Sequence, residues 1–172
     1  MRNLIFQTIQ SALLGIVDAD NRPVIQHIDR YNNQLQYAEE EQPFCTPAVL
    51  IQFRPIKWRP LGKGVREAEV EVALHIITDS RVGSWSDTMT VFSFLDTINA
   101  RLHGLHAVES KRTMDSLTLV ASETDSEFDE LEDNVETYVC HVTDGSACMV
   151  PATDSQNIVF DIGAELHHPA GI

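Results

Sequence analysis

The feature of this sequence that most constrains its fold is a strand-like stretch followed at once by a helix-like stretch, between Val65 and Leu105. From Ala68 to Ile76 the even positions are apolar and most odd positions are polar or charged, a period of two that indicates a half-buried strand. After a turn at 79–83 the apolar residues recur every three or four positions, as on an amphipathic helix, at Val91, Leu95, Ile98, Leu102 and Leu105. Ser84 followed by Asp87 predicts the start of this helix as a capping-box-like pair, and Gly104 predicts its end.

The length and composition fit one folded domain that needs no disulfide or structural metal. At 172 residues, 43% of them hydrophobic, the chain can bury a core of its own. Its net charge of −14 opposes binding of the whole chain to nucleic acid or to an anionic membrane, and it favours the solubility of a self-associating protein. We see no secretory leader and no apolar run long enough to span a membrane, so we expect no membrane partner.

The three cysteines are Cys45, Cys140 and Cys148, and no two of them have CxxC spacing. An odd, unpatterned set fits a reducing compartment. We therefore expect buried free thiols in place of a redox pair or a metal site.

The rest of the chain predicts a second helix and several strands. Apolar spacing indicates a helix at Asn3–Leu14 that ends near Gly15. Strand-forming residues mark four further segments: Val24–Ile28, Ala48–Trp58, Leu117–Ser122 and Val135–Thr143. The segment Tyr31–Glu41 has the composition of a loop with an edge strand, and Ile158–Phe160 has that of a short strand.

The segment Ala48–Trp58 and the strand that starts at Val65 should form a long antiparallel hairpin. Pro55 and Pro60 fit poorly inside a sheet, so we expect this hairpin to project from it. The predicted fold class is α+β, with a mainly antiparallel sheet of about four to five strands, the projecting hairpin and two helices packed on one face. Residues 1–143 form the predicted domain, and residues 144–172 form an extension packed on it or extending from it.

Three glutamates, Glu67, Glu69 and Glu71, lie on one face of the predicted strand, roughly 7 Å apart in turn. Paired carboxylates can perform acid–base chemistry or hold a hard cation, but the sequence shows no apolar pocket that would tune them. A solvated sheet face is the favoured interpretation. In an assembly, the same face would suit the lining of a passage, where it would repel DNA phosphates.

Other polar clusters also have simpler explanations than a site. The segment 123–134 holds seven acids in twelve residues but lacks the glycine and the ladder of an EF-hand, so it is predicted as a solvated loop or one helical turn pinned by Phe128 and Leu131. His103 and His106 are spaced like metal ligands, but histidines also favour a helix C-terminus. No nucleophile elbow or phosphate loop is present. We predict no catalytic residues, no cofactor and no metal, so the chain is not expected to be an enzyme.

The basic residues are unevenly distributed. Five of the twelve lie within thirteen positions of the hairpin, together with Trp58: Arg54, Lys57, Arg59, Lys63 and Arg66. In a chain this acidic, such a segment suits an acidic partner surface, for which another copy of the protein is a candidate. These six residues are the predicted subunit or partner interface. A solvated loop with its Trp folded back on the sheet is the simpler alternative.

The order of these segments resembles the tail terminator and tail-completion proteins of long-tailed bacteriophages and their prophages. Those chains carry an N-terminal helix, a Pro-flanked strand like 46–51, a long hairpin leading into a strand like 69–77, a helix like 87–105 and two closing strands. The resemblance covers about Ile5 to Thr143 and is one of order and texture, without a catalytic motif. The acidic segment before the last strand and the residues from Asp144 onward depart from it.

The resemblance implies a structural virion protein that forms a ring, usually a hexamer, at the head-proximal end of the tail. Its implied partners are other copies, the tail tube and the head-connector proteins, with DNA passing through without sequence recognition. The implied location is the tail or neck of the virion, and the bacterial host cytoplasm during assembly. Glu67, Glu69 and Glu71 would then be the lumen-facing acidic face.

Three alternatives remain. The first, which the resemblance implies, is a neck or connector ring protein of different stoichiometry. The second is an acidic DNA-mimic that binds a DNA-binding protein. The net charge and the acid-rich segment support it. The third is a small enzyme that uses the three glutamates or the histidines, for which no ordered set of catalytic roles is visible.

Overall fold

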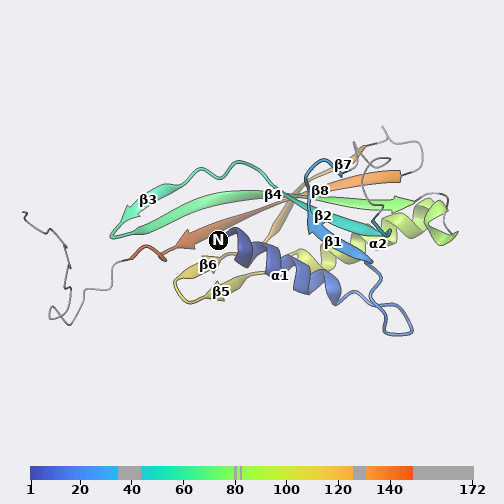
Figure 1. Cartoon of the computed structure of the whole chain (residues 1–172), viewed down its shortest axis with the longest axis horizontal. Coiled ribbons are helices and arrows are strands. Elements are labelled where there is room, and N and C mark those ends of the chain that lie inside the picture. Colours follow the sequence, from blue (N-terminus) through green and yellow to red (C-terminus); the bar gives the residue numbers. More distant parts are fainter. Residues whose placement is uncertain (35–43, 80, 82, 126–130, 149–172) are drawn as a thin grey trace, which may run out of the picture.

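The computed structural model describes residues 1–34, 44–79, 81, 83–125 and 131–148 (Figure 1). Two α-helices are present in this part, α1 (Arg2–Leu14) and α2 (Thr88–Leu102), and a short 3₁₀ helix, η2 (Gly83–Ser86), precedes α2. The strands are β1 (His27–Arg30), β2 (Ala48–Phe53), β3 (Arg59–Gly62), β4 (Val65–Asp79), β5 (Ala107–Glu109), β6 (Arg112–Met114), β7 (Thr118–Asp125) and β8 (Leu131–Asp144). The predicted edge strand within 31–41 and the predicted strand 158–160 lie mostly or wholly outside the described residues.

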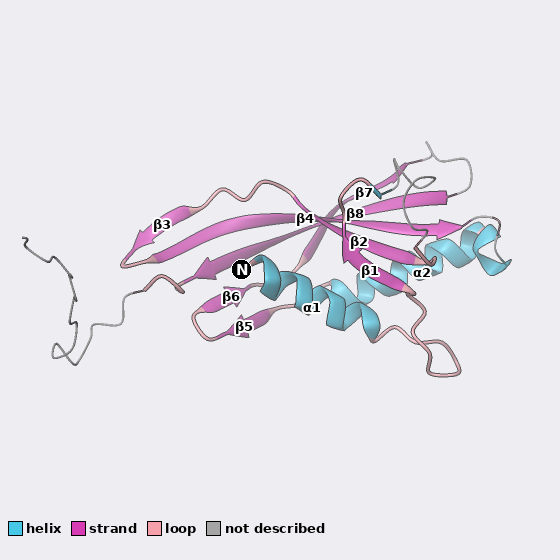
Figure 2. Ribbon diagram, viewed as in Figure 1, coloured by secondary structure: helices cyan, strands magenta, loops and turns pink. Residues whose placement is uncertain are grey.

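A ladder between the two long strands, β4 and β8, organises the sheet. These strands are antiparallel and pair without interruption from Arg66 with Asp144 to Asp79 with Leu131. Each has two shorter strands on its outer side, β2 and β3 on β4, and β7 and β6 on β8, while β1 and β5 complete the sheet (Figure 2). The ladder therefore fixes where every other strand lies.

The α+β class is confirmed, but the prediction of a mainly antiparallel sheet of four to five strands is wrong. The sheet has eight strands and is mixed, because β1 pairs with β2 in parallel, His27 opposite Ala48. Two further strands, β5 and β6, form a hairpin, and each has only three residues, too few to show a period in the sequence. The segment Ala48–Trp58 also ends early, at Phe53, before β3 resumes the pairing with β4.

Both helices cover the same face of the sheet, as predicted. Residues of α1 and α2 pack in one cluster with the even-numbered residues of β4 from Ala68 to Ile76 and with the matching face of β8. Ile5, Ile9, Ile98 and Leu102 are fully buried in it. Tyr138 on β8 is also fully buried, and its hydroxyl donates a hydrogen bond to the Asn99 side chain of α2, which ties the helix to the centre of the ladder.

The opposite face of β4 is exposed only along its first half. Glu69 and Glu71 are exposed, but every residue from Val72 to Asp79 is buried, so the single solvated face expected for the whole strand is wrong. The cause is a second apolar cluster, formed by Ala48, Leu50 and Ile77 and flanked by Tyr31, Phe44 and Leu131. The strand is therefore half-buried at one end and fully buried at the other.

The ends of α2 differ in part from the prediction. The N-cap is Asp87, whose carboxylate accepts a hydrogen bond from the Thr90 backbone N–H, while Ser84 lies in η2. The capping-box interpretation of Ser84 is therefore wrong, because η2 occupies the position where the first turn of α2 was expected. Gly104 follows the helix with φ of +76°, a conformation that favours glycine, and so confirms the predicted stop.

The acid-rich segment is not the predicted loop along its whole length. β7 extends to Asp125 and β8 begins at Leu131, so most of these acids lie on two paired strands. Ser122 donates a hydrogen bond to Glu136 at 2.7 Å and Thr124 donates one to Asn134 at 2.9 Å across this pair. Hydroxyl partners of this kind let acidic and amide side chains occupy a strand. The predicted helical turn at Phe128 lies outside the described residues.

All three cysteines are free thiols, but only Cys140 is buried, whereas Cys45 is exposed and Cys148 is half-buried. Burial, with a smaller effect of Asp115, raises the pKa of the Cys140 thiol to about 11, so this thiol stays protonated and unreactive at neutral pH. The expectation of buried thiols is therefore confirmed for Cys140 and wrong for Cys45.

Candidate assembly surface

The hairpin of β3 and the first residues of β4 forms one end of the molecule (Figure 1). Its tip is a run of three residues with positive φ, Gly62 at +96°, Lys63 at +52° and Gly64 at +80°. Glycine tolerates this conformation without steric cost, which is why the chain can reverse so tightly here. Gly64 also lies against the backbone of Ala147, so the tip contacts the segment that follows β8.

Gly64→Ala should lower the free energy of unfolding by at least about 2 kcal/mol. A Cβ at this position would lie 2.2 Å from the Ala147 carbonyl oxygen, and the positive φ adds its own strain. Gly62→Ala is the matched control, because it has a positive φ but no atom within 4 Å of the added Cβ. Urea unfolding of both variants measures the difference, and equal losses would show that the contact with Ala147 contributes nothing.

The basic residues of the chain gather at this end. Four of the five from the hairpin, Lys57, Arg59, Lys63 and Arg66, are joined by three from distant parts of the sequence: Arg2, Lys111 and Arg112. Arg2 lines the same shallow depression as Trp58 and Arg66. Arg112 lies on β6 beside Asp144, and the Lys111 ammonium lies 3.4 Å from the Cys148 carbonyl oxygen. Seven of the twelve basic residues thus lie at one end, which we call the basic end, whereas Arg54 lies opposite Glu71, near the middle of β4.

On the sheet face away from the helices, the predicted interface and the predicted acidic face are neighbours. The Arg59 Nε lies 3.0 Å from a Glu67 carboxylate oxygen, and the Arg54 Nε lies 3.6 Å from one of Glu71. His141 lies 3.5 Å from Glu67 and 3.4 Å from Asp115. These exposed pairs are worth at most about 1 kcal/mol each. Glu67 and Glu71 are therefore partly neutralised, and Lys57 and Lys63 have no ion-pair partner among the described residues.

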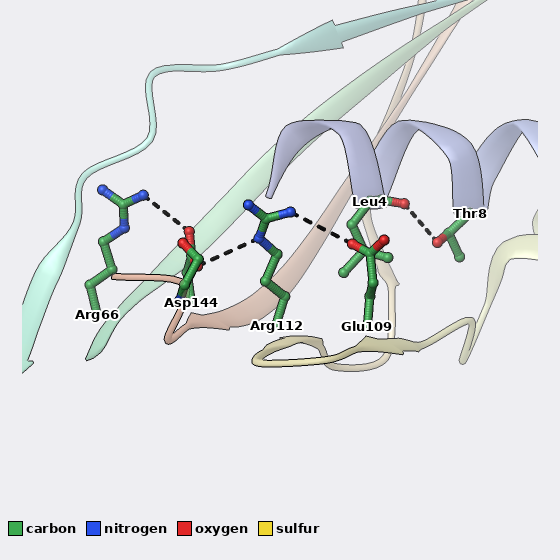
Figure 3. Close-up of polar contacts among 7 residues, drawn as sticks. Leu4, Thr8, Arg66, Glu109, Arg112 and Asp144 are labelled. Atoms are coloured by element: carbon green, nitrogen blue, oxygen red, sulfur yellow. Dashed lines mark hydrogen bonds and ion pairs between the residues drawn. The ribbon is translucent and has the colours of Figure 1, made fainter. Parts of the chain in front are cut away.

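On the helix side of the basic end, a buried carboxylate joins three segments (Figure 3). Asp144 is 2% exposed, and its carboxylate oxygens lie 3.0 Å from Nη2 of Arg66 and 3.6 Å from Nε of Arg112. The Nη1 atom of Arg112 lies 3.6 Å from a carboxylate oxygen of Glu109. The Arg66 guanidinium also lies over the Trp58 ring, 4.5 Å from its centroid, a cation–π contact. Trp58 therefore packs back on the core, as the simpler sequence interpretation held.

The electrostatics of this group have clear causes. Burial alone would raise the pKa of Asp144, but hydrogen bonds from Ser146 and the Arg66 guanidinium outweigh it and hold this pKa well below its usual range. Partial burial, and then the positive charge of Arg112, lowers the pKa of the Met1 amino group. Asp144 is thus the anion around which the cations of the basic end are arranged.

A buried His–Asp pair lies at the other end of the ladder. The His75 Nδ1 lies 2.8 Å from Oδ2 of Asp133, and the Tyr31 ring stacks on the imidazole with 3.9 Å between ring centroids. Asp133 is 2% exposed, and its Oδ1 has no hydrogen-bond partner among the described residues. The alternation with a period of two predicts that His75, at an odd position, shares the solvated face of the three glutamates, but here it is a buried partner of an acid from the neighbouring strand.

The remaining candidate residues have structural roles or none. His103 is the C-cap residue of α2, and the His106 ring Nδ1 lies 3.2 Å from the Gly104 carbonyl oxygen. Within the described residues no cluster of three His, Cys, Asp or Glu side chains could hold a metal ion. None of the described helices has the length and apolar character that crossing a membrane requires.

The sequence identified the hairpin but missed Arg2, Lys111, Arg112 and Asp144. Their meeting depends on the pairing of β6 with β8 and on the position of the α1 N-terminus, neither of which leaves a pattern in the sequence. The only signal was the position of Asp144 directly after an apolar strand pattern.

The fold and this surface define an α+β protein with two helices on a mixed, curled sheet and a strongly basic end on an acidic chain. No protein-family model matches the chain, and no curated protein matches it by sequence. Among solved structures, it is similar to a chain of the "Virion of native gene transfer agent (GTA) particle", with a TM-score of 0.51 and 13% identity. The likeness covers 83% of this chain and 94% of that one, and it shows a shared fold.

Proposed function

We propose that this chain is a structural virion protein of a tailed bacteriophage, prophage or related particle, and that it acts as a tail terminator or tail-completion protein. The observation that carries the proposal is the shared fold with a chain of a virion particle, which extends over nearly the whole of both chains. The order of segments that resembles tail terminators supports it independently. The activity proposed is assembly, not catalysis.

In this proposal, copies form a ring, most simply a hexamer, at the head-proximal end of the tail. The ring joins the tail tube to the head connector. The ladder of β4 and β8, with two helices packed on it, supplies a rigid body, and the basic end reaches a neighbour. The exposed Glu69, flanked by Glu67 and Glu71, faces the passage and repels DNA phosphates, although two of these three glutamates are paired to arginines.

A neck or connector ring of different stoichiometry is the second candidate, because the same fold likeness to a virion chain supports it equally. The DNA-mimic alternative is less well supported, since seven of the twelve basic residues form one end of the molecule. A surface of that sign repels a DNA-binding protein instead of attracting it.

The proposal is tested by light scattering and electron microscopy of the purified full chain, alone and with isolated tail tubes. We expect rings, or binding at one end of the tube, and the mass of the ring separates the two candidates. A chain that stays monomeric at high concentration and binds no tube end would overturn both.

Lys57→Glu with Lys63→Glu should reduce the assembled fraction by roughly tenfold or more at physiological salt, because it reverses the unpaired charges of the basic end. These two lysines are better targets than Arg59, whose replacement by Glu would also repel Glu67 at 3.0 Å. Analytical ultracentrifugation measures the assembled fraction, and circular dichroism checks the fold.

The control is Arg30→Glu with Arg101→Glu, which makes the same charge change at exposed residues outside the basic end that have no ion-pair partner among the described residues. It should leave assembly nearly unchanged. Equal effects of the two double variants would show that overall charge, and not the basic end, controls assembly.

A further inference from the structure

We infer that the surface receiving the basic end is the free edge of β7 on a second copy of this chain. This inference rests on the proposed function and adds to it the location and chemistry of the second contact surface. It follows from the edge itself, from the charges of the two surfaces and from their positions on one molecule.

β7 is an open strand edge. It pairs with β8 on one side and with no other described strand on the other. Residues 118 and 120–124 are exposed, and Val120, at an irregularity of the pairing, is 56% exposed. Natural proteins usually protect such an edge with lysine, proline, a β-bulge or very short length. This eight-residue strand has neither lysine nor proline, and beyond its irregularity at Val120 it pairs regularly from Ala121 to Asp125. No described strand pairs with its outward carbonyl oxygens, which can act as hydrogen-bond acceptors.

The charges of the two surfaces are opposite. Neither β7 nor β8 contains a lysine or an arginine, and β7 carries Glu123 and Asp125 beside Glu132 of β8. Of these, Glu123 is exposed on β7 itself. The basic end supplies Lys57 and Lys63, which are exposed, are donors only, and match both the carboxylate and the open carbonyl groups.

Each surface also has an exposed apolar residue. Leu61 on β3 is 49% exposed, next to Lys63, and Val120 on β7 is 56% exposed, three residues before Glu123. Contact between them would remove apolar area from water at the centre of a charged contact. Pro60 lacks an N–H, so β3 is poorly suited to a regular ladder with another strand, and side chains carry the contact.

The two surfaces cannot meet within one chain. β3 pairs with β4 at residues 65–67, whereas β7 pairs with the part of β8 that lies opposite residues 71–77 of β4. The middle of β3 and the middle of β7 are therefore roughly 27 Å apart along the strand direction. They also lie on opposite edges of the β4–β8 ladder, β3 beside β4 and β7 beside β8. A contact between them must therefore join different copies head to tail, and such heterologous contacts close into rings when the rotation per copy permits.

The test is cross-linking of full-length variants that carry Cys45→Ser and Cys148→Ser to remove the two accessible thiols. Leu61→Cys and Val120→Cys are made in separate chains, mixed, and treated with a short bis-maleimide. We expect a linked dimer from the mixture and little product from either protein alone. With both cysteines in one chain, we expect a ladder of linked species up to the size of the ring.

Met89→Cys replaces Leu61→Cys in the control, because Met89 is 68% exposed at the start of α2, which follows the end of β4 that lies far from Leu61, and it should not link to Val120→Cys. Assembly seen by light scattering without a link between positions 61 and 120, or with Val120→Cys linking to itself, would overturn the inference and leave the proposed function standing. A chain that neither assembles nor binds tail tubes would overturn both.

Discussion

Asp144→Asn should lower the free energy of unfolding by about 2 to 3 kcal/mol at neutral pH, because it removes the buried anion of the basic end. Loss of one partner from a fully buried pair costs more, but Arg66 and Arg112 are about half and one-third exposed and can be solvated again. Urea unfolding at pH 7 measures the loss. Glu109→Gln is the matched control, since the same acid-to-amide change at an exposed, weakly paired residue should cost under about 0.5 kcal/mol.

The same variant should change how stability depends on pH. The pKa of Asp144 is lower in the folded state than in the unfolded chain, so its contribution is fully present above the ordinary aspartate pKa of about 4. It is lost as the pH falls from there through the depressed folded value. The wild-type chain should lose stability more steeply than Asp144→Asn below about pH 4, so the two curves converge. Parallel curves would show that the pKa of Asp144 is the same in the folded and unfolded states, which would contradict this prediction.

His75→Leu should lower the free energy of unfolding by about 3 to 5 kcal/mol, because it leaves the Asp133 carboxylate buried without its partner. Asp133 is 2% exposed, and among the described side chains His75 is the one that contacts its carboxylate. Gln52→Leu is the control for loss of polar contact, since the Gln52 oxygen lies 3.5 Å from His75 Nε2 and should contribute under about 1 kcal/mol.

The double variant His75→Leu with Asp133→Leu should recover much of that loss. Removing both members of a buried pair leaves no uncompensated charge, and apolar side chains suit the cluster around Leu50 and Ile77. A double-mutant cycle in urea gives the coupling energy. Additive losses would mean that the two residues stabilise the fold independently.

The local elements could be predicted from the sequence, and their non-local pairing could not. The alternation from Ala68 to Ile76 and the helical spacing from Val91 to Leu102 predicted β4 and α2, because each pattern is produced by burial of one face. The parallel pairing of β1 depends on His27 meeting Ala48, which no local period records. The second buried face of β4 was missed because His75 and Asp79 look solvated until their partners are placed.

The candidate surface shows the same division. The basic hairpin was visible because its five cations are close together in the sequence. The pairing of Arg59 with Glu67, and the gathering of Arg2, Arg112 and Asp144, became visible only with the topology. The interface itself remains a prediction that the assembly experiments must test.

The long ladder also has a consequence for how the chain folds. It joins position 79 to position 131 at one end and position 66 to position 144 at the other, so every pair requires closure of a long loop. Such non-local pairing makes folding slow. The difference in closure entropy between the two ends is only about 0.4 kcal/mol, so burial decides the order. The end with both faces buried gains most and should pair first. The strand pairs at the basic end should then form last. A partly folded chain therefore lacks the complete surface that would join it to its neighbour.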